Sequence, residues 1–526
     1  MNKNRRKTYL SKSRYTTFCQ CGKALWLNTR HPEYATKDSS IEARFAEGNV
    51  IGDLAMGLFG NFTEVTTYTP DMKLDIGAMI DKTRRLMNEG CPVICEASFS
   101  YSDDAGRNEY CAVDILKRSE DGWSIYEVKS SSSHEGEEYT DPDKFRKYAI
   151  DIAYQKYTLV KCGVNVTGTY LVTLNSDYRR DGDINVKELF NILNLKDLVS
   201  EEYEKVAGNT KIAHSILDQE EEPLKDLGMH CNNPYPCAFW NYCTKQLGLD
   251  LDHDKETVFS LYRASLKKKL QLFYDGKVAF GDIRHEKLNK IQQMQIECTL
   301  NNTLSIDKIG IQSFLHKVTY PLYFLDFESM MSALPQYDGV KPYMQVCFQY
   351  SLHYIETEGG ELKHKAFLAP SDGTDPRRPL AEALCRDIPK DVCVMAYNDP
   401  FEKGRIREMA DAFPDLASHL MNIHDNIIDL LIPFRSGYYY TPAMGGSFSI
   451  KSVLPALFPD DPELDYHNLD SLVQNGGDAM TIFPTIKDMN PDNAKAARDA
   501  LLNYCHLDTM AMVRVWEKLK EAVSCC

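Results

Sequence analysis

The sequence predicts a chain of the α/β class that folds into more than one domain. Its 526 residues exceed what one ordinary hydrophobic core holds, so we expect two or three domains. Hydrophobic residues make up 43% and charged residues 26%, a profile typical of folded proteins rather than of disordered or fibrous ones. Segments with the strand period of two alternate with helical segments along most of the chain. This alternation predicts a mixture of helix and sheet.

Composition also narrows the class of protein. The formal net charge of −16 argues against binding nucleic acid through overall positive charge. The sequence has no run of about 20 apolar residues that would cross a bilayer, and its basic N-terminus lacks the apolar run of a secretory signal. We therefore expect a cytoplasmic protein that does not bind a membrane. In such a protein the 16 cysteines are expected to be free thiols or metal ligands rather than disulfides.

Three regions can be separated by pattern. Residues 1–250 alternate helical and strand-like segments and end in a cysteine-rich stretch. Residues 251–317 are expected to form a helical connector. Residues 318–526 are predicted to form a second α/β domain that closes with a long helix. Its first strands are expected at residues 320–327, 346–355 and 362–368.

An acid and a lysine share one face of a predicted strand over residues 123–129. Alternation along the strand places Glu127 and Lys129 on the same side. Such a pair can be a solvated ion pair on the strand surface. The alternative is a catalytic pair, because a lysine ammonium can orient a water molecule or stabilise developing negative charge.

Two further acids lie on the neighbouring predicted strands. Asp114 lies among apolar residues of the strand expected over 109–117, where a lone carboxylate is costly without a partner. Glu96 lies on the strand expected over 91–101. Carboxylate oxygens bind Mg²⁺ or Mn²⁺, and such a cation polarises a phosphoryl oxygen and lowers the pKa of an attacking water. The acids therefore indicate metal-assisted hydrolysis of phosphodiesters.

The order of Asp114 followed by Glu127-x-Lys129 resembles the PD-(D/E)xK nuclease superfamily. The resemblance implies a restriction-endonuclease-like fold in which Asp114 and Glu127 bind Mg²⁺ or Mn²⁺. The catalytic residues that it implies are Glu96, Asp114, Glu127, Lys129 and Gln155.

Gln155 lies on a predicted helix over residues 145–162. RecB-like members of the superfamily carry a glutamine there, followed four residues later by a tyrosine. Position 159 is Leu in this chain, and Tyr157 is the alternative residue. The competing interpretation of Gln155 is an amide on the helix surface.

Three cysteines recur at intervals of six residues, at Cys231, Cys237 and Cys243. Together with a distant N-terminal cysteine they resemble the iron–sulfur staple of CRISPR-associated and AddB-type RecB-like nucleases, which clamps the two ends of the nuclease domain. By that resemblance Cys21, rather than Cys19, is the fourth ligand. Zinc and unliganded buried thiols are the alternatives, and the wide spacing favours a 4Fe–4S cluster.

Two carboxylates lie two residues apart at Asp326 and Glu328, on one face of a predicted strand. They repel each other unless a cation lies between them. This Asp-x-Glu resembles the first motif of DnaQ/RNase H-like exonucleases of the DEDD type. The segment from Asn398 to Glu402 resembles their second motif, with Glu in place of Asp. Asp429 is a reserve candidate for the second acid.

The closing helix is expected to begin with Asn490 as its cap and Pro491 at its first position. Tyr504 and Asp508 lie four residues apart, which places them on one face of that helix. They resemble the tyrosine variant of the third exonuclease motif. His506 is at the wrong offset for the histidine variant and is interpreted as an ordinary polar residue.

The DEDD resemblance implies two metal ions about 4 Å apart, with Tyr504 orienting the attacking water. Their ligands would be Asp326, Glu328, Glu402 and Asp508. Residues 438–455 further resemble bacterial proteins in which a RecB-like nuclease is fused to an RNase H-like domain of unassigned function.

The whole-chain resemblance implies a DNA exonuclease with two catalytic centres, acting in DNA repair or in defence against phages and mobile elements. DNA is favoured over RNA as the substrate, and protein partners in a repair or defence complex are expected. One alternative keeps a single active centre beside a binding domain, and another is an iron–sulfur scaffold without catalysis. The candidates for phosphate contact are Arg14, Arg179, Arg180, Lys403 and Arg405, although each of them taken singly is better interpreted as an ordinary surface residue.

Overall fold

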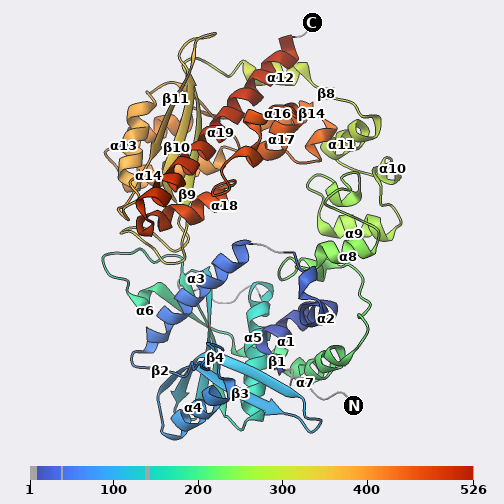
Figure 1. Cartoon of the computed structure of the whole chain (residues 1–526), viewed down its shortest axis with the longest axis vertical. Helices are drawn as coiled ribbons and strands as arrows, with labels where there is room; N and C mark the ends of the chain where they lie inside the picture. Colours follow the sequence, from blue (N-terminus) through green and yellow to red (C-terminus); the bar gives the residue numbers. More distant parts are fainter. Residues whose placement is uncertain (1–8, 37–38, 135, 137–141, 525–526) are drawn as a thin grey trace. The chain divides into compact units, whose positions relative to one another are not determined.

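The computed structural model describes residues 9–36, 39–134, 136 and 142–524. It divides into two compact units (Figure 1). The first comprises Met1–Asp250 and Ser332–Tyr343, and the second comprises Leu251–Met331 and Met344–Cys526. Residues 251–317 belong to the second unit. Each unit combines helices with sheet, so the α/β class predicted from the sequence is confirmed. Within the described ranges, no helix has both the length and the apolar character needed to cross a membrane.

In the described part of the first unit, seven strands form one mixed sheet. They are β1 (Tyr9–Ser11), β2 (Thr63–Glu64), β3 (Val93–Ser102), β4 (Asn108–Ser119), β5 (Gly122–Ser133), β6 (Val166–Asn175) and β7 (Phe190–Asn194). The order is β2-β3-β4-β5-β6-β7, and β1 pairs in parallel with β4. Strands β3, β4 and β5 are antiparallel, whereas β6 runs parallel to β5.

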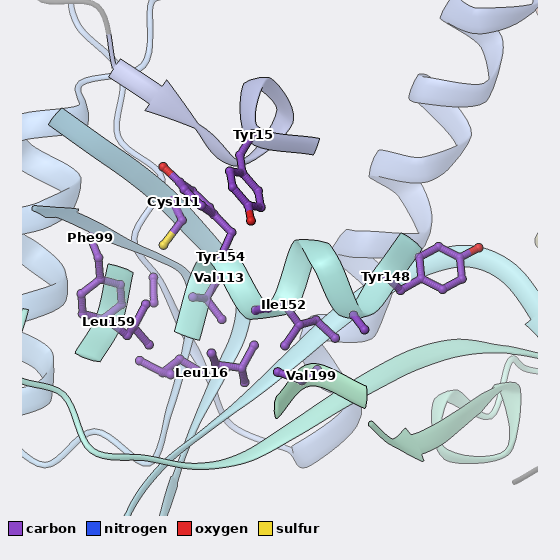
Figure 2. Packing of buried hydrophobic residues seen from close by; sticks show 14 of the residues in the cluster. Tyr15, Phe99, Cys111, Val113, Leu116, Tyr148, Ile152, Tyr154, Leu159 and Val199 are labelled. Atoms are coloured by element: carbon purple, nitrogen blue, oxygen red, sulfur yellow. The ribbon is translucent and has the colours of Figure 1, made fainter. Parts of the chain in front are cut away.

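Helices cover both faces of this sheet. They are α1 (Lys12–Gln20), α2 (Gly22–Arg30), α3 (Ser39–Ala55), α4 (Ile76–Asn88), α5 (Pro142–Lys161), α6 (Val186–Leu189), α7 (Lys196–Asp218) and α8 (Trp240–Gln246). Figure 2 shows the core between α5 and the sheet, where Ile152 lies close to Val113 and Leu116. The rings of Tyr15 and Tyr154 stack there with centroids 4.6 Å apart. This packing fixes α1 and α5 over the same sheet face.

Residues Ser332–Tyr343 belong to the first unit although they follow it by about 80 positions in the sequence. Ala333 is fully buried in a core cluster that also holds Tyr126 and Val128 of β5. The hydroxyl of Tyr343 donates to the carbonyl oxygen of Ser130 at 2.6 Å. The segment therefore completes the packing on the sheet face opposite α5.

In the second unit, five strands of the described chain form a separate sheet. They are β9 (Leu322–Met330), β10 (Val346–Ile355), β11 (Leu362–Leu368), β12 (Cys393–Ala396) and β13 (Ile427–Asp429). The order is β11-β10-β9-β12-β13. The first three are antiparallel, whereas β12 runs parallel to β9 and β13 parallel to β12. A small separate ribbon pairs β8 (Ser305–Ile306) with β14 (Tyr439–Tyr440).

Alternation along β9 separates an apolar face from an acidic face. The unit's helices are α9 (Leu266–Tyr274), α10 (Phe280–Ile283), α11 (Lys290–Asn301), α12 (Lys308–Leu315), α13 (Arg377–Asp387), α14 (Pro400–Ala412), α15 (Ala417–Asp425), α16 (Ile432–Arg435), α17 (Ile450–Leu457), α18 (Gly476–Ile482) and α19 (Pro491–Ser524). Leu325 and its odd-numbered neighbours pack against α13, α14 and α15. Phe324 instead meets Trp516 of α19, which crosses the other face of the sheet (Figure 1). Asp326 and Glu328 therefore face α19.

Candidate functional site

In the first unit, Glu127 is the centre of a buried polar cluster. Its side chain is fully buried, and three donors reach its two oxygens. Lys129 Nζ and Lys12 Nζ donate to Oε1 at 2.5 and 2.9 Å, and Gln155 Nε2 donates to Oε2 at 2.6 Å. Alternation along β5 puts Glu127 and Lys129 on the face that α5 covers with Gln155. The structure therefore brings three of the predicted residues into direct contact.

Asp114 and Glu96 approach this cluster from β4 and β3. Asp114 Oδ2 accepts a hydrogen bond from the backbone N–H of Val128 at 2.7 Å, and its Oδ1 lies 3.6 Å from Lys12 Nζ. The register of β3 and β4 sets Glu96 opposite Asp114. The φ of Glu96 is 57°, a left-handed conformation that is uncommon outside glycine and that often marks functional sites. Burial and the charge of Asp114 raise the pKa of Glu96 to about 7.

Lys12 and Asp151 belong to the cluster but were not predicted from the sequence. Lys129 Nζ donates to Asp151 Oδ2 at 3.0 Å, and Gln155 Nε2 donates to Oδ1 at 3.2 Å. Asp151 lies one helical turn before Gln155, so the i, i+4 spacing was an available signal. Lys12 is the first residue of α1 and meets Glu127 across 115 residues of sequence. No local pattern could have predicted that contact.

The acids of the cluster have pKa values shifted in opposite directions. Burial raises the pKa of Asp114 and of Asp151, and the charge of Glu127 adds to both shifts. Burial would also raise the pKa of Glu127, but the two lysines lower it overall. Carboxylates held this close in a buried position suit a divalent cation, because the cation removes their mutual repulsion.

The second unit gathers Asp326, Glu328 and Cys505 between β9 and α19. One ligand atom from each lies within 4.8 Å of the other two. The sulfur of Cys505 is 3.8 Å from Asp326 Oδ2. Burial and then the charge of Asp508 raise the pKa of both Asp326 and Glu328. The predicted acids of the first and third motifs therefore influence one another directly.

Asp508 is held by residues that the sequence did not single out. The hydroxyl of Tyr466 donates to Asp508 Oδ1 at 2.6 Å. Lys451 Nζ lies 5.1 Å from the ring centroid of Tyr466 and 5.0 Å from that of Tyr504. Its positive charge lowers the pKa of Asp508 and of Glu328 against the larger raising effect of burial. Tyr504 is buried, and burial together with the charge of Asp508 raises its pKa.

Glu402 and Asp429 differ in how their oxygens are satisfied. Glu402, in the first turn of α14, is buried, and within the described residues its Oε2 has no hydrogen-bond partner. Burial raises its pKa to about 8. Asp429 Oδ1 instead accepts from the backbone N–H groups of Asn398 and Leu431, both at 2.9 Å, and Arg435 reaches Oδ2. Glu402 therefore has an oxygen free for a cation, whereas Asp429 braces the turn at Asn398.

The four predicted cysteines line one pocket in the first unit. Cys21 lies between α1 and α2, and the backbone N–H of Cys237 donates to the carbonyl oxygen of Cys231 at 2.8 Å. Burial raises the pKa of Cys243 to about 11. No three of these four described sulfur atoms lie within 4.8 Å of one another.

Hydrogen bonds also join the two ends of the first unit beside these cysteines. Gln20 Nε2 donates to the carbonyl oxygens of His230 and Tyr235 at 2.9 and 2.7 Å. Trp26 Nε1 donates to the carbonyl oxygen of Gln219 at 3.1 Å. These hydrogen bonds therefore hold the N-terminal helices against the cysteine-rich stretch.

The basic residues expected to contact phosphates have partners inside their own units. Arg179 Nη1 donates to the carbonyl oxygen of Gly339, and Arg180 Nη1 to that of Gln336. Both guanidinium groups thus hold the Ser332–Tyr343 segment. The partners of Arg14, Lys403 and Arg405 are Tyr9, Asp399 and Glu408, respectively.

Residues 323–449 match a family described as a domain of unknown function, DUF2779. The matched part includes Asp326, Glu328 and Glu402 and ends before α19. No curated protein matches the chain at a significant level. The family match covers three of the four predicted acids of the second cluster and assigns no activity to them.

Proposed function

We propose that this protein is a metal-dependent nuclease with one catalytic centre in each unit. The observation that carries the proposal is that each unit gathers a group of carboxylates contributed by its sheet and by helices packed against that sheet. Buried acids of like charge are expensive unless cations balance them. Lys12 and Lys129 offset part of this charge in the first unit, and Lys451 offsets part of it in the second.

In the first centre, Asp114 and Glu127 would hold Mg²⁺ or Mn²⁺. The cation would supply polarisation of the phosphoryl oxygen and a lower pKa for the attacking water. Lys129 lies within hydrogen-bond distance of Glu127 and can orient that water, and Gln155 fixes the second oxygen of Glu127. The hydrogen bonds that join residues of β4, β5 and α5 support the PD-(D/E)xK interpretation. Glu96 lies at the edge of this cluster.

In the second centre, Asp326, Glu328, Glu402 and Asp508 would hold the cations. The acid-bearing strand β9 is central in its sheet, with an antiparallel pair on one side and a parallel pair on the other, and α19 crosses its acidic face. This arrangement supports the RNase H-like DEDD interpretation. Tyr504 would orient the attacking water, and Tyr466 holds Asp508 in place.

A 4Fe–4S cluster bound by Cys21, Cys231, Cys237 and Cys243 belongs to the same proposal. Its role would be structural, because it would join segments more than 200 residues apart in the chain. The substrate that we propose is DNA, and the pathway is repair or defence against mobile elements in the cytoplasm. Partner proteins in such a complex are part of the proposal.

Digestion of end-labelled DNA and RNA with Mg²⁺ or Mn²⁺ tests this function. We expect Lys129→Ala to inactivate the first centre and Asp326→Asn the second, each by on the order of 10²-fold or more. Lys187→Ala and Asp411→Ala are the matched controls, since both residues are exposed and lie outside the clusters. Undiminished digestion by the double variant would reject both centres.

The same variants separate the main alternative, in which one centre is active and the other unit only binds. The glutamate at position 402, where DEDD enzymes have aspartate, favours the second unit as the binding one. In that case Asp326→Asn would leave the digestion of every substrate unchanged, whereas Lys129→Ala would abolish it.

A further inference from the structure

Three histidines from three different elements meet on the α19 side of the second sheet. His353 of β10 is the cross-strand partner of His364 of β11, and His506 comes from α19. The ring centroids are 4.5 Å apart for His353 and His364, 4.7 Å for His353 and His506, and 4.4 Å for His364 and His506. One nitrogen from each ring lies within 4.8 Å of the other two. The three rings therefore converge on a single point.

The closest pair of nitrogens has the separation of two ligands on one ion. His506 Nδ1 lies 3.2 Å from His364 Nε2. Two nitrogens that each lie about 2.0–2.1 Å from a tetrahedral zinc ion are roughly 3.4 Å apart. The same separation would also allow a hydrogen bond between the two rings.

Hydroxyl groups surround the three rings and help to orient them. His353 Nδ1 lies 2.8 Å from Thr509 Oγ1, which leaves its Nε2 for another ligand. Thr509 Oγ1 is in turn 2.7 Å from Ser351 Oγ, which lies 2.9 Å from His364 Nε2, a contact that a bound cation would replace. Histidine ligands of metals commonly have their second nitrogen fixed in this way.

We propose that His353, His364 and His506 form a binding site for a divalent transition cation, with zinc as the best fit. Imidazole ligands without a carboxylate suit zinc, nickel or copper better than magnesium, so this site differs in chemistry from the acidic cluster. His353 is buried while His364 is exposed, so a cation could reach the site from solvent.

The site would fasten α19 to the sheet close to the acidic cluster. His506 lies two residues before Asp508 on the same helix, and Ser351 of β10 is paired with Asp326 of β9. A cation held by the three histidines would cross-link β10, β11 and α19 beside Asp326 and Asp508. Its role is to position the helix, and the binding itself does not depend on the nuclease activity proposed above.

Zinc binding by the full-length protein tests the proposal. The chelator-treated protein is equilibrated with Zn²⁺ alone, and bound zinc is counted for the wild type, His364→Gln, His506→Gln and the double variant. We expect the double variant to bind one equivalent fewer than the wild type, since any zinc on the cysteines or acids is common to both. His316→Gln, an exposed histidine outside the cluster, is the control and should bind as the wild type does.

A second pair of measurements guards against misfolding of the double variant. His364 is exposed on β11, so His364→Gln alone should fold and still lose the equivalent. Thr509→Val should weaken zinc binding by about 10–100-fold, because it removes the hydroxyl that fixes His353. Equal zinc content and affinity in the wild type, His364→Gln and Thr509→Val would show a hydrogen-bonded imidazole network and would overturn the proposal.

Discussion

Lys12 contacts three carboxylates of the first acidic cluster. Its ammonium lies 2.9 Å from Glu127 Oε1, 3.6 Å from Asp114 Oδ1 and 3.8 Å from Asp151 Oδ1. Burial lowers the pKa of Lys12, but these three carboxylates raise it overall. A positive charge in this position balances the acids in the same way as a divalent cation would. Lys12 and the cation therefore substitute for one another in part.

We expect Lys12→Met to destabilise the protein most in the presence of EDTA. The loss should be about 2 kcal/mol, between the values for exposed and buried ion pairs, since the side chain is partly exposed. Saturating Mg²⁺ or Mn²⁺ should reduce the loss, because the cation takes over the neutralisation. Denaturant unfolding measures this loss in the free energy of unfolding, and Lys187→Met is the control. An equal loss with and without the cation would contradict this role.

Among the elements, helix α19 contributes several residues to the second acidic cluster and to the histidine cluster. One turn presents Tyr504, Asp508 and Cys505 to the acidic cluster, and the adjoining faces present His506 and Thr509 to the other histidines. The helix begins at Pro491, as its Asn490-Pro sequence predicts. Asn490 Oδ1 accepts from the backbone N–H of Asn493 at 2.9 Å, which is the expected N-cap bond.

Asn490→Ala should lower the free energy of unfolding of the second unit by about 1 kcal/mol, because the first turn of α19 loses its cap. Asn490→Asp should keep the stability, since its carboxylate accepts the same hydrogen bond and interacts favourably with the helix N-terminus. Chemical denaturation followed by circular dichroism compares the two. Equal stability of the alanine and aspartate variants would show that the cap contributes nothing.

At the scale of the whole molecule, the chain enters the first unit twice. Residues Ser332–Tyr343 lie between β9 and β10 in the sequence but pack in the core of the first unit. The backbone N–H of Ala333 donates to Glu47 Oε1 at 2.5 Å, and Arg180 holds the carbonyl oxygen of Gln336. A cut between the two units in the sequence therefore does not release the first unit from this segment.

Limited proteolysis checks this arrangement. The exposed residues 252–256 are the expected cleavage site, because they form an exposed stretch at the sequence boundary between the units. The two fragments should then elute together under native conditions and separate only on denaturation. Ala333→Asp should let them separate, since it buries a charge in the core. Separation of the wild-type fragments without denaturant would contradict the prediction.

The sequence by itself determined which of the predicted acids share a face of one strand or helix. Alternation along one strand was enough to predict that Glu127 and Lys129 share a face, and the same period pairs Asp326 with Glu328. The helical period did the same for Tyr504 and Asp508. These predictions succeeded because each depends on a local repeat of the backbone, which fixes the direction of side chains two or four residues apart.

Only the tertiary structure decided which distant residues complete each site. Lys12 meets Glu127 across 115 residues, and Tyr466 meets Asp508 across 42. His506, interpreted from the sequence as an ordinary polar residue, faces His364 across 142. Such contacts leave no periodic signal, because strand order and helix docking bring the partners together through burial of the whole core. The local sequence therefore determines which side chains share a face of one element. Which elements contribute to a site depends on how all the elements pack together.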